Sequence, residues 1–263
     1  MFPVIPLSLS VRHLTLTAGE RLLLQDISFD VKKGAYLTVI GPNGAGKTTL
    51  LKCLDNILTG WSGEIRLGSV PLQTIPPLML ARRIAFVHQG TSVPFAFTVR
   101  QLVEMGRYPH LGWLSPLSRE DRNIIDEAME TMGISSLAER SAETLSGGEM
   151  QKVNLAAALV QQADILFLDE PTTYLDYKYQ SEIGQLLRSL NQQHGKTIIE
   201  VTHDVNRALS DATHVLAVSE GRIVFDGSPD YLMDAGHLHN IYGIRFQFVD
   251  HPNLPLKIVV PGV

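Results

Sequence analysis

Two glycine-rich segments of this chain have the composition and spacing of phosphate-binding loops. The first fits the pattern G-x-x-x-x-G-K-[ST] at every fixed position and reads Gly41-Pro42-Asn43-Gly44-Ala45-Gly46-Lys47-Thr48. The second is a glycine pair at the start of an expected helix, Leu145-Ser146-Gly147-Gly148-Glu149. Each segment would direct backbone N–H groups and the positive end of a helix toward an anion. Both segments cannot serve one nucleotide from the same copy, so the sequence predicts a nucleotide held between two protomers.

The first segment offers side chains for a triphosphate as well as backbone amides. Its glycines allow the backbone to wrap closely around an anion with the amides pointing inward. Lys47 is expected to reach the β- and γ-phosphates, and Thr48 to offer its hydroxyl to Mg²⁺. The alternative is a glycine turn without a ligand, and it is disfavoured because a strand precedes the loop and a helix follows it. The predicted nucleotide-binding residues here are Gly41, Pro42, Asn43, Gly44, Ala45, Gly46, Lys47, Thr48 and Thr49.

Polar residues at the ends of three predicted strands complete the candidate chemistry. Asp169 and Glu170 follow the apolar run 165–168, where an acid would lie beside the glycine loop of an α/β sheet. Asp169 is expected to hold Mg²⁺, directly or through water, and Glu170 to orient or deprotonate the attacking water. Gln89 could approach the metal and the γ-phosphate, and His203 could donate a hydrogen bond to a γ-oxygen. Taken singly, Gln89 and His203 are more typical of solvated surface residues.

These residues need a layered scaffold to bring them together. Apolar runs with strand character alternate with segments of helical spacing, which predicts a mostly parallel sheet covered on both faces. A helical insertion is expected at about 90–160, with helices at 98–107 and 118–132, the second capped by Ser118. The other predicted helices are 47–58 and 176–191. The predicted strands are 7–16, 22–24, 27–31, 36–40, 65–67, 84–87, 165–168, 197–201, a hairpin of 215–218 with 222–225, and two edge strands within 244–260.

The composition excludes several classes of protein. The 263 residues are 44% hydrophobic and 19% charged with a net charge of −5, as expected for a globular protein without an electrostatic footprint for nucleic acid. The single cysteine, Cys53, excludes an intrachain disulfide and fits a reducing compartment. No apolar run approaches the roughly 20 residues of a membrane span, so another chain would supply any spans. The start, residues 1–10, is expected to lead into a strand and not to be a signal peptide.

Along almost its whole length the chain resembles the ATPase subunits of ABC transporters. The order and spacing of its motifs carry that resemblance: the P-loop 41–49, Gln89 as the Q-loop glutamine, the signature 145–149, the strand end at Asp169 and Glu170, Leu175-Asp176 as the D-loop, and His203. The fold implied is an α/β P-loop NTPase core with a mostly parallel central sheet, an N-terminal antiparallel β part and a helical subdomain insertion. One ABC ATPase domain would then span 1–263, with a core of about 1–89 and 161–263 and a helical subdomain of about 90–160.

The resemblance also implies roles for the site residues. Two copies would sandwich two ATP molecules with Mg²⁺, each ATP bound by one copy's P-loop and by Ser146, Gly147 and Gly148 of the other. Asp176 would contact the facing P-loop. Glu170 would act as general base while His203 steadies the γ-phosphate. The predicted catalytic residues are Lys47, Gln89, Glu170 and His203, and the predicted metal-binding residues are Thr48, Gln89 and Asp169.

Within the family the chain is similar to importer ATPases for metal chelates. The segments 98–99, 106–110 and 171–176 carry this narrower likeness. It implies an ATPase on the cytoplasmic face of the inner membrane that drives uptake of iron–siderophore through a separate permease. A periplasmic or lipoprotein binding protein would supply the cargo. The alternatives are haem, cobalamin or molybdate import, an exporter ATPase, a soluble ABC ATPase and a non-catalytic regulator.

Two departures from the family pattern stand out. The family usually stacks adenine on an aromatic residue near the end of the first strand, and here that position falls on Thr17, Ala18 or Gly19. Base affinity or base preference is therefore expected to differ. The signature continues as Glu149-Met150-Gln151-Lys152, where the subfamily more often has Gln and Arg.

Overall fold

The computed structural model describes residues 9–88, 97–112, 115–173, 175–250 and 257–262, and these residues form two compact units. The first unit contains 9–75 and 188–262, and the second contains 76–187. Each unit is described in turn. Helix α6 (Tyr177–Gln192) begins in the second unit and ends in the first. The boundaries of the helical subdomain, expected near residues 90 and 160, stay a prediction.

The first unit opens with an antiparallel sheet, which confirms the predicted N-terminal β part. Its strands are β1 (Leu9–Ala18), β2 (Arg21–Val31), β4 (Ser62–Leu67) and β5 (Val70–Pro71), in the order β2-β1-β4-β5. A short 3₁₀ turn, Leu72–Thr74, follows. The prediction of two strands at 22–24 and 27–31 was wrong, because β2 is continuous. Asp26 has φ 55° and the β1–β2 register shifts nearby, so a bulge interrupts the alternation that marks one strand.

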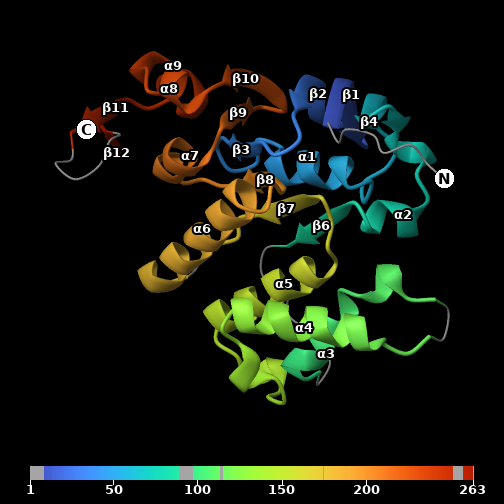
Figure 1. The fold of residues 1–263 in the computed structure, drawn as a ribbon. Helices are drawn as coiled ribbons and strands as arrows, with labels where there is room; N and C mark the ends of the chain where they lie inside the picture. The colour runs from blue at the N-terminus through green and yellow to red at the C-terminus, as the bar shows by residue number, and fades with distance from the viewer. Residues whose placement is uncertain (1–8, 89–96, 113–114, 174, 251–256, 263) are drawn as a thin grey trace. The chain divides into compact units, whose positions relative to one another are not determined.

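Four further strands of this unit belong to the predicted, mostly parallel sheet. Strand β3 (Tyr36–Ile40) pairs in parallel with both β8 (Thr197–Val201) and β9 (His214–Ser219), and the predicted hairpin is confirmed as β9 with β10 (Arg222–Gly227). Every residue of β3 and β8 is buried, as expected for central strands of a parallel sheet. Figure 1 shows these strands with helices around them. The helices are α1 (Lys47–Leu54), α7 (Val205–Asp211), α8 (Pro229–Leu232) and α9 (Ala235–Tyr242).

The two predicted C-terminal strands are present, and they form a sheet of their own. Strand β11 (Phe246–Val249) pairs with β12 (Ile258–Pro261) in a separate two-stranded antiparallel sheet. Asn206 of α7 holds this small sheet: its amide donates to the Val259 carbonyl at 3.0 Å and its oxygen accepts from the Val259 N–H at 2.7 Å. The tail therefore packs beside α7 and does not extend the main sheet. The prolines at 252 and 255, like residues 1–8 at the start, lie outside the described residues.

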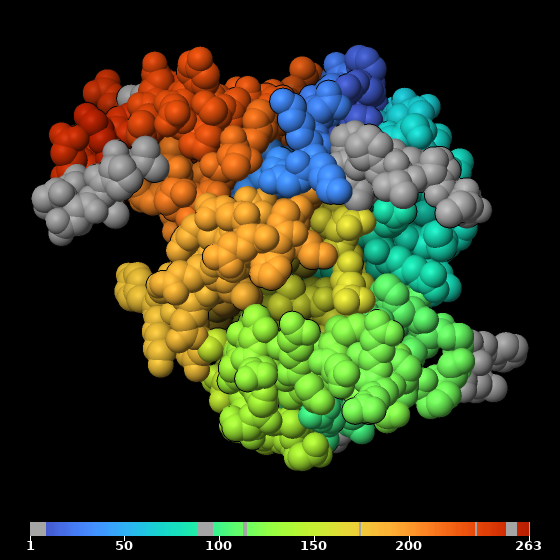
Figure 2. Space-filling view, in the orientation of Figure 1, coloured from blue at the N-terminus to red at the C-terminus, as the bar shows by residue number. Residues whose placement is uncertain are grey.

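The second unit combines a parallel strand pair with a group of helices. Strand β6 (Ile84–Val87) pairs in parallel with β7 (Ile165–Asp169), and α2 (Pro77–Ala81) precedes β6. The helical part contains α3 (Val99–Met105), α4 (Arg119–Thr131) and α5 (Gly147–Val160), with 3₁₀ turns at Tyr108–His110, Ser135–Leu137 and Ala142–Thr144. In Figures 1 and 2 the green segments of this part gather into one body. The predicted helical insertion is thus present as helices.

Helix caps and one buried ion pair fix the helical part. The Ser118 hydroxyl accepts from the Asp121 N–H while the Asp121 carboxylate accepts from the Ser118 N–H, so the predicted N-cap of α4 is a capping box. Asp121 also accepts from Arg107 Nε at 2.9 Å, and Arg107 donates to the Val160 carbonyl at the end of α5 at 2.6 Å. Burial of this Arg–Asp pair joins the loop after α3 to α4 and α5. Among the described residues, no helix is both long and apolar enough to cross a bilayer.

Asp55, the residue that caps the C-terminal end of helix α1, carries a carboxylate whose charged form is disfavoured by burial. Burial raises the pKa of Asp55 from 3.8 to about 7. Between about pH 4 and 7 the folded state therefore binds this proton more strongly than the unfolded chain does, and the free energy of unfolding falls as pH rises through that window. We expect Asp55→Asn to remove this loss and to stabilise the protein by on the order of 2 kcal/mol at pH 8. Urea unfolding at pH 5 and pH 8 measures this change in the free energy of unfolding. The control is Asp230→Asn, which changes an exposed carboxylate. If the free energy of unfolding depended on pH equally in both variants, the prediction for Asp55 would be contradicted.

Candidate functional site

The P-loop of the first unit joins the end of β3 to the start of α1. Gly41 has φ 143°, and a Cβ built on it would lie 2.0 Å from the Val218 carbonyl oxygen. Gly46 has φ 104°, and its Cβ would lie 3.0 Å from the Leu23 oxygen. These two glycines are required because neighbouring backbone approaches them closely. Gly44 also has a left-handed φ of 76°, yet nothing lies within 4 Å of its Cβ position, so this part of the loop faces open space.

Lys47 is held over the loop by backbone carbonyl groups. Its Nζ donates to the carbonyl oxygens of Gly41 at 2.8 Å and Pro42 at 3.0 Å, and only 6% of the residue is exposed. The ammonium group is thereby fixed at the loop, where its long side chain would otherwise be mobile. Thr48 and Thr49 follow in the first helical turn and are partly exposed. The loop can present a fixed positive charge, backbone amides and two hydroxyls to one anion.

His203 lies at the same end of the first unit's sheet as the P-loop. It follows β8, the parallel neighbour of β3, and the Thr202 N–H donates to the Val39 carbonyl at 3.1 Å. His203 is exposed, and the next residue, Asp204, caps α7 by accepting from the Arg207 N–H at 3.1 Å. The imidazole thus stands between a buried strand and a capped helix. Its placement at the carboxyl end of the sheet is the one that the sequence predicts for it.

A buried charged cluster, made of Tyr36, Glu200, Arg207 and Asp211, supports this end of the first unit. Glu200 of β8 is fully buried; the Tyr36 hydroxyl of β3 donates to it, and Arg207 Nε of α7 lies 3.1 Å from its other oxygen. Arg207 Nε also lies 3.8 Å from Asp211. Burial raises the pKa of Glu200, and the positive charge of Arg207 opposes that rise. The cluster ties α7 to both strands that lead into the P-loop and His203.

The signature segment of the second unit is a capped helix N-terminus. Ser146 caps α5: its hydroxyl accepts from the Glu149 N–H, and its own N–H and hydroxyl both donate to Glu149 Oε2 at 2.8 Å. These hydrogen bonds hold the pKa of Glu149 below its usual value. Ser146 and Gly147 are exposed, and a Cβ at Gly147 would meet nothing within 4 Å. The helix end is therefore accessible to an external anion.

The second unit also holds the strand-end carboxylates and the D-loop aspartate. Asp169 ends β7 and is 4% exposed, while Glu170 adopts a left-handed φ of 50° that turns the chain sharply. The Glu170 carboxylate accepts from the Thr173 hydroxyl at 2.9 Å, which fixes its orientation. Asp176 caps α6 by accepting from the Tyr179 N–H at 2.9 Å. Asp169 is thus buried, while its neighbour Glu170 is partly exposed.

The predicted site residues fall into two sets. The first unit brings together the P-loop 41–49 and His203, and the second contains Ser146, Gly147, Gly148, Asp169, Glu170 and Asp176. That the two sets act on one nucleotide stays a prediction. Gln89 lies outside the described residues. At the predicted base position, Thr17 and Ala18 are exposed at the end of β1 and Gly19 is in the following turn, so no aromatic ring is offered there.

Sequence reasoning missed two sets of contacts at these elements. Glu200 sits inside a uniformly buried strand, and its charge within an apolar run was the signal that could have indicated a buried pair. Tyr179 packs against Gly148, and no local pattern in the sequence predicts that contact. The described residues contain no group of three or more His, Cys, Asp or Glu arranged to hold a metal ion.

Comparison with known families shows to which family the chain belongs. The family model described as ABC transporter matches residues 24–173, which contain the P-loop, the signature and both strand-end carboxylates. The chain belongs to the ABC transporter family. Among curated relatives of this ABC protein is the ferric enterobactin transport ATP-binding protein FepC of Escherichia coli (strain K12). It is 38% identical over 249 residues, which cover 95% of this chain and 92% of the relative.

Solved structures agree with this membership. A metal-chelate type ABC transporter in an inward-facing conformation has a chain that matches with a TM-score of 0.86 at 28% identity, covering 98% of both chains. A second match is a dimeric ATP-binding cassette in a post-hydrolysis state bound to ADP and Pi. Its TM-score is 0.74 at 26% identity, covering 84% of this chain and 98% of the other. The predicted ABC ATPase fold is confirmed.

Proposed function

We propose that this chain is the ATP-hydrolysing subunit of an ABC importer that drives uptake of a metal chelate, with iron–siderophore as the cargo. The observation that carries the proposal is the presence on one chain of two anion-binding elements, the P-loop at Lys47 and the capped helix end at Ser146. The relative FepC, named for ferric enterobactin transport, supports the cargo. The metal-chelate type ABC transporter supports a metal chelate as the class of cargo.

In the proposed active dimer, each ATP is bound by the P-loop of one copy and by Ser146, Gly147 and Gly148 of the other. The solved dimeric cassette bound to ADP and Pi supports a two-copy arrangement. Lys47 neutralises the β- and γ-phosphates from its position over the loop. Asp176 contacts the facing P-loop. Each phosphate contact is a charge-assisted hydrogen bond in a site that loses water when the copies close.

The chain's own residues account for hydrolysis. Glu170 accepts a proton from the attacking water, and the Thr173 hydroxyl holds the carboxylate in place for that role. His203 donates a hydrogen bond to a γ-oxygen and stabilises the charge that develops there. The Thr48 hydroxyl and the Asp169 carboxylate are hard oxygen donors that fit Mg²⁺, with Gln89 as a third candidate. When bound, Mg²⁺ would neutralise charge on the β- and γ-phosphates.

Closure and reopening would power the membrane partner. ATP draws two open copies together. Hydrolysis then breaks the bond between the β- and γ-phosphates of each ATP that bridges the copies, and the copies separate. Moving an equilibrium from mostly open to mostly closed needs about 5.5 kcal/mol of differential binding, which two bridging ATP molecules can supply. The permease would dock through a cytoplasmic helix beside Gln89 and the segment 90–110. This places the ATPase on the cytoplasmic face of the inner membrane, with a periplasmic or lipoprotein binding protein delivering cargo.

Uptake in cells tests the function and the cargo together. We expect cells that carry only Lys47→Ala to lose accumulation of radioactive iron supplied as a ferric siderophore, while cobalamin uptake is unchanged. Loss of haem, cobalamin or molybdate uptake in place of iron uptake would reassign the cargo. Normal uptake of all four would contradict the importer proposal. Cells with Lys52→Ala, a change at the other end of helix α1, serve as the matched control.

A further inference from the structure

The starting point is a close contact between the signature helix and the D-loop helix inside the second unit. A Cβ built on Gly148 would lie 2.8 Å from Cδ2, 2.9 Å from Cγ and 3.0 Å from Cε2 of the Tyr179 ring. The ring therefore lies directly against the backbone of Gly148, which is buried. A side chain at position 148 would displace the ring. The glycine is thus required by a neighbouring aromatic side chain as well as by any bound phosphate.

The same tyrosine also belongs to the D-loop. Its backbone N–H donates to Asp176 Oδ1 at 2.9 Å, the hydrogen bond that caps the start of α6. One residue therefore touches the signature through its ring and the D-loop through its main chain. Any movement of α6 that carries Asp176 must also move the surface on which Gly148 rests.

One turn further along the two helices, an ion pair forms a second contact between α5 and α6. Lys152 follows Gly148 by four positions on α5, and Glu182 follows Tyr179 by three on α6, so each pair shares a helix face. Lys152 Nζ lies 2.5 Å from Glu182 Oε2 and 5.0 Å from the centroid of the Tyr179 ring. The Lys152 side chain is only 18% exposed. Lys152, the departure noted in the sequence, thus has a defined partner on α6.

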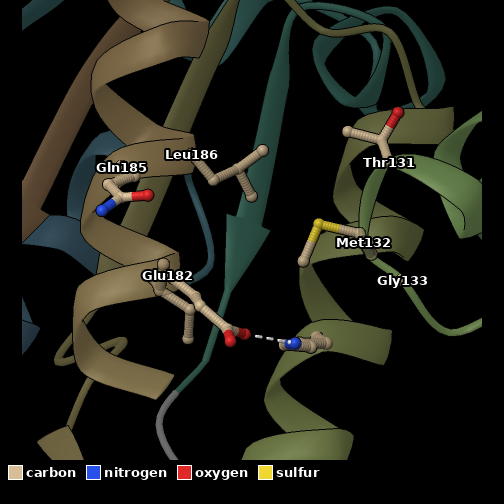
Figure 3. Close-up of a pocket in the computed structure, with 8 residues that line it drawn as sticks. Thr131, Met132, Gly133, Glu182, Gln185 and Leu186 are labelled. Atoms are coloured by element: carbon tan, nitrogen blue, oxygen red, sulfur yellow. Dashed lines mark ion pairs between the residues drawn. The ribbon is translucent and has the colours of Figure 1, made fainter. Parts of the chain in front are cut away.

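Beyond this ion pair the helices of the second unit separate around a hollow. A pocket of about 450 Å³ opens between the end of α4, α5 and α6, lined by residues that include Met132, Gly133, Ile183 and Leu186. Figure 3 shows Glu182 reaching toward α5 at the edge of this space, with Leu186 and Met132 on opposite sides of it. Lys152 and Glu182, which form the ion pair, both line this pocket.

We propose that Tyr179, with the Lys152–Glu182 pair, is a positioning device that holds the signature Ser146–Gly148 and the D-loop Asp176 as one rigid piece. This inference rests on the proposed function, in which both elements meet the nucleotide bound by the partner copy. When the signature and the D-loop are held together, both contact that nucleotide in one step. Without Tyr179 each element must be ordered separately when the dimer closes, and that ordering weakens closure. Nucleotide binding to the P-loop of a single copy does not use this device.

The test is ATP-driven dimerisation measured in the Glu170→Gln background, in which hydrolysis is blocked. We expect Tyr179→Ala to raise the protein concentration needed for dimerisation by about tenfold or more, because the signature and the D-loop must then be ordered separately on closure. We expect Tyr179→Phe to stay within about twofold, because the ring makes the contact with Gly148. The Kd of a fluorescent ATP analogue for the dilute, monomeric protein should change by less than about twofold in both.

The ion pair gives a second test that does not depend on removing a large side chain. We expect Lys152→Glu or Glu182→Lys alone to weaken dimerisation about fivefold, and the double exchange to recover most of the loss. Dimerisation of Tyr179→Ala at the control concentration, or a double exchange as weak as either single change, would overturn the inference. Failure of the Glu170→Gln background itself to dimerise with ATP would instead count against the proposed function. The two failures are therefore distinguishable.

Discussion

Replacing Lys47 by alanine is expected to lower kcat/KM for ATP by about 10³-fold, because it removes the fixed positive charge over the P-loop. In the structure the Gly41 and Pro42 carbonyls hold the ammonium group at the loop. Phosphate release with saturating ATP and Mg²⁺ measures the effect. Because the Lys47 contacts also fix the loop, the thermal midpoint without nucleotide should be recorded in parallel.

The matched control for Lys47→Ala is Lys52→Ala, on the same helix and in its last turn. That variant removes the same charge from α1 without touching the loop, so we expect wild-type hydrolysis. Lys47→Arg separates charge from geometry: it keeps the charge, but the larger planar group cannot occupy the place of the ammonium against two carbonyls. We expect it to be nearly as inactive as Lys47→Ala. Near-normal turnover in Lys47→Ala would exclude the assigned role of the P-loop.

The second large effect is expected from Glu170→Gln, which should bind ATP, fail to hydrolyse it and accumulate as a dimer. The loss of the general base is expected to lower kcat by about 10²–10⁴-fold. The amide has the same shape, and its oxygen can still accept from the Thr173 hydroxyl, so the left-handed turn at position 170 should be preserved. Light scattering after size exclusion, with and without ATP, measures the change in mass.

A glutamate with a similar backbone provides the control for Glu170→Gln. Glu220 also has a left-handed φ, of 49°, in the exposed turn between β9 and β10. Glu220→Gln changes the charge at an equivalent turn, and we expect it to hydrolyse ATP and to remain in the wild-type distribution of monomer and dimer. A Glu170→Gln protein that is monomeric with ATP bound would argue against the sandwich.

Local patterns in the sequence were enough to predict the individual elements of the site. The P-loop is a contiguous motif whose fixed positions report directly on backbone geometry, and the left-handed φ values at Gly41, Gly44 and Gly46 agree with it. The cap at Ser118 was also predictable, because a capping box involves residues only three apart. The mostly apolar runs 36–40 and 197–201 identified β3 and β8 as strands. In each case the determining interactions lie within a few residues of one another.

Contacts between distant segments could not be predicted in the same way. The continuity of β2 depends on pairing with β1 through a bulge at Asp26, which the alternation pattern alone presents as a break. The packing of Tyr179 on Gly148 joins residues of two different helices, and neither residue type indicates the other. The partnership of Glu200 with Arg207 and Tyr36 depends on the parallel pairing of β3 and β8 and on the docking of α7. Such contacts follow from topology, which a single sequence does not determine.

The central claim, that two copies share each ATP, is tested most directly by mixing two inactive variants. Homodimers of Lys47→Ala lack a working P-loop, and homodimers of Ser146→Arg lack a working signature. A mixed dimer carries both lesions in one composite site and none in the other, so at equal concentrations we expect hydrolysis to recover to about a quarter of the wild-type rate. If a single chain encloses its own nucleotide, no chain in the mixture is intact. Phosphate release would then stay at the level of the separate variants, and that result would contradict shared binding.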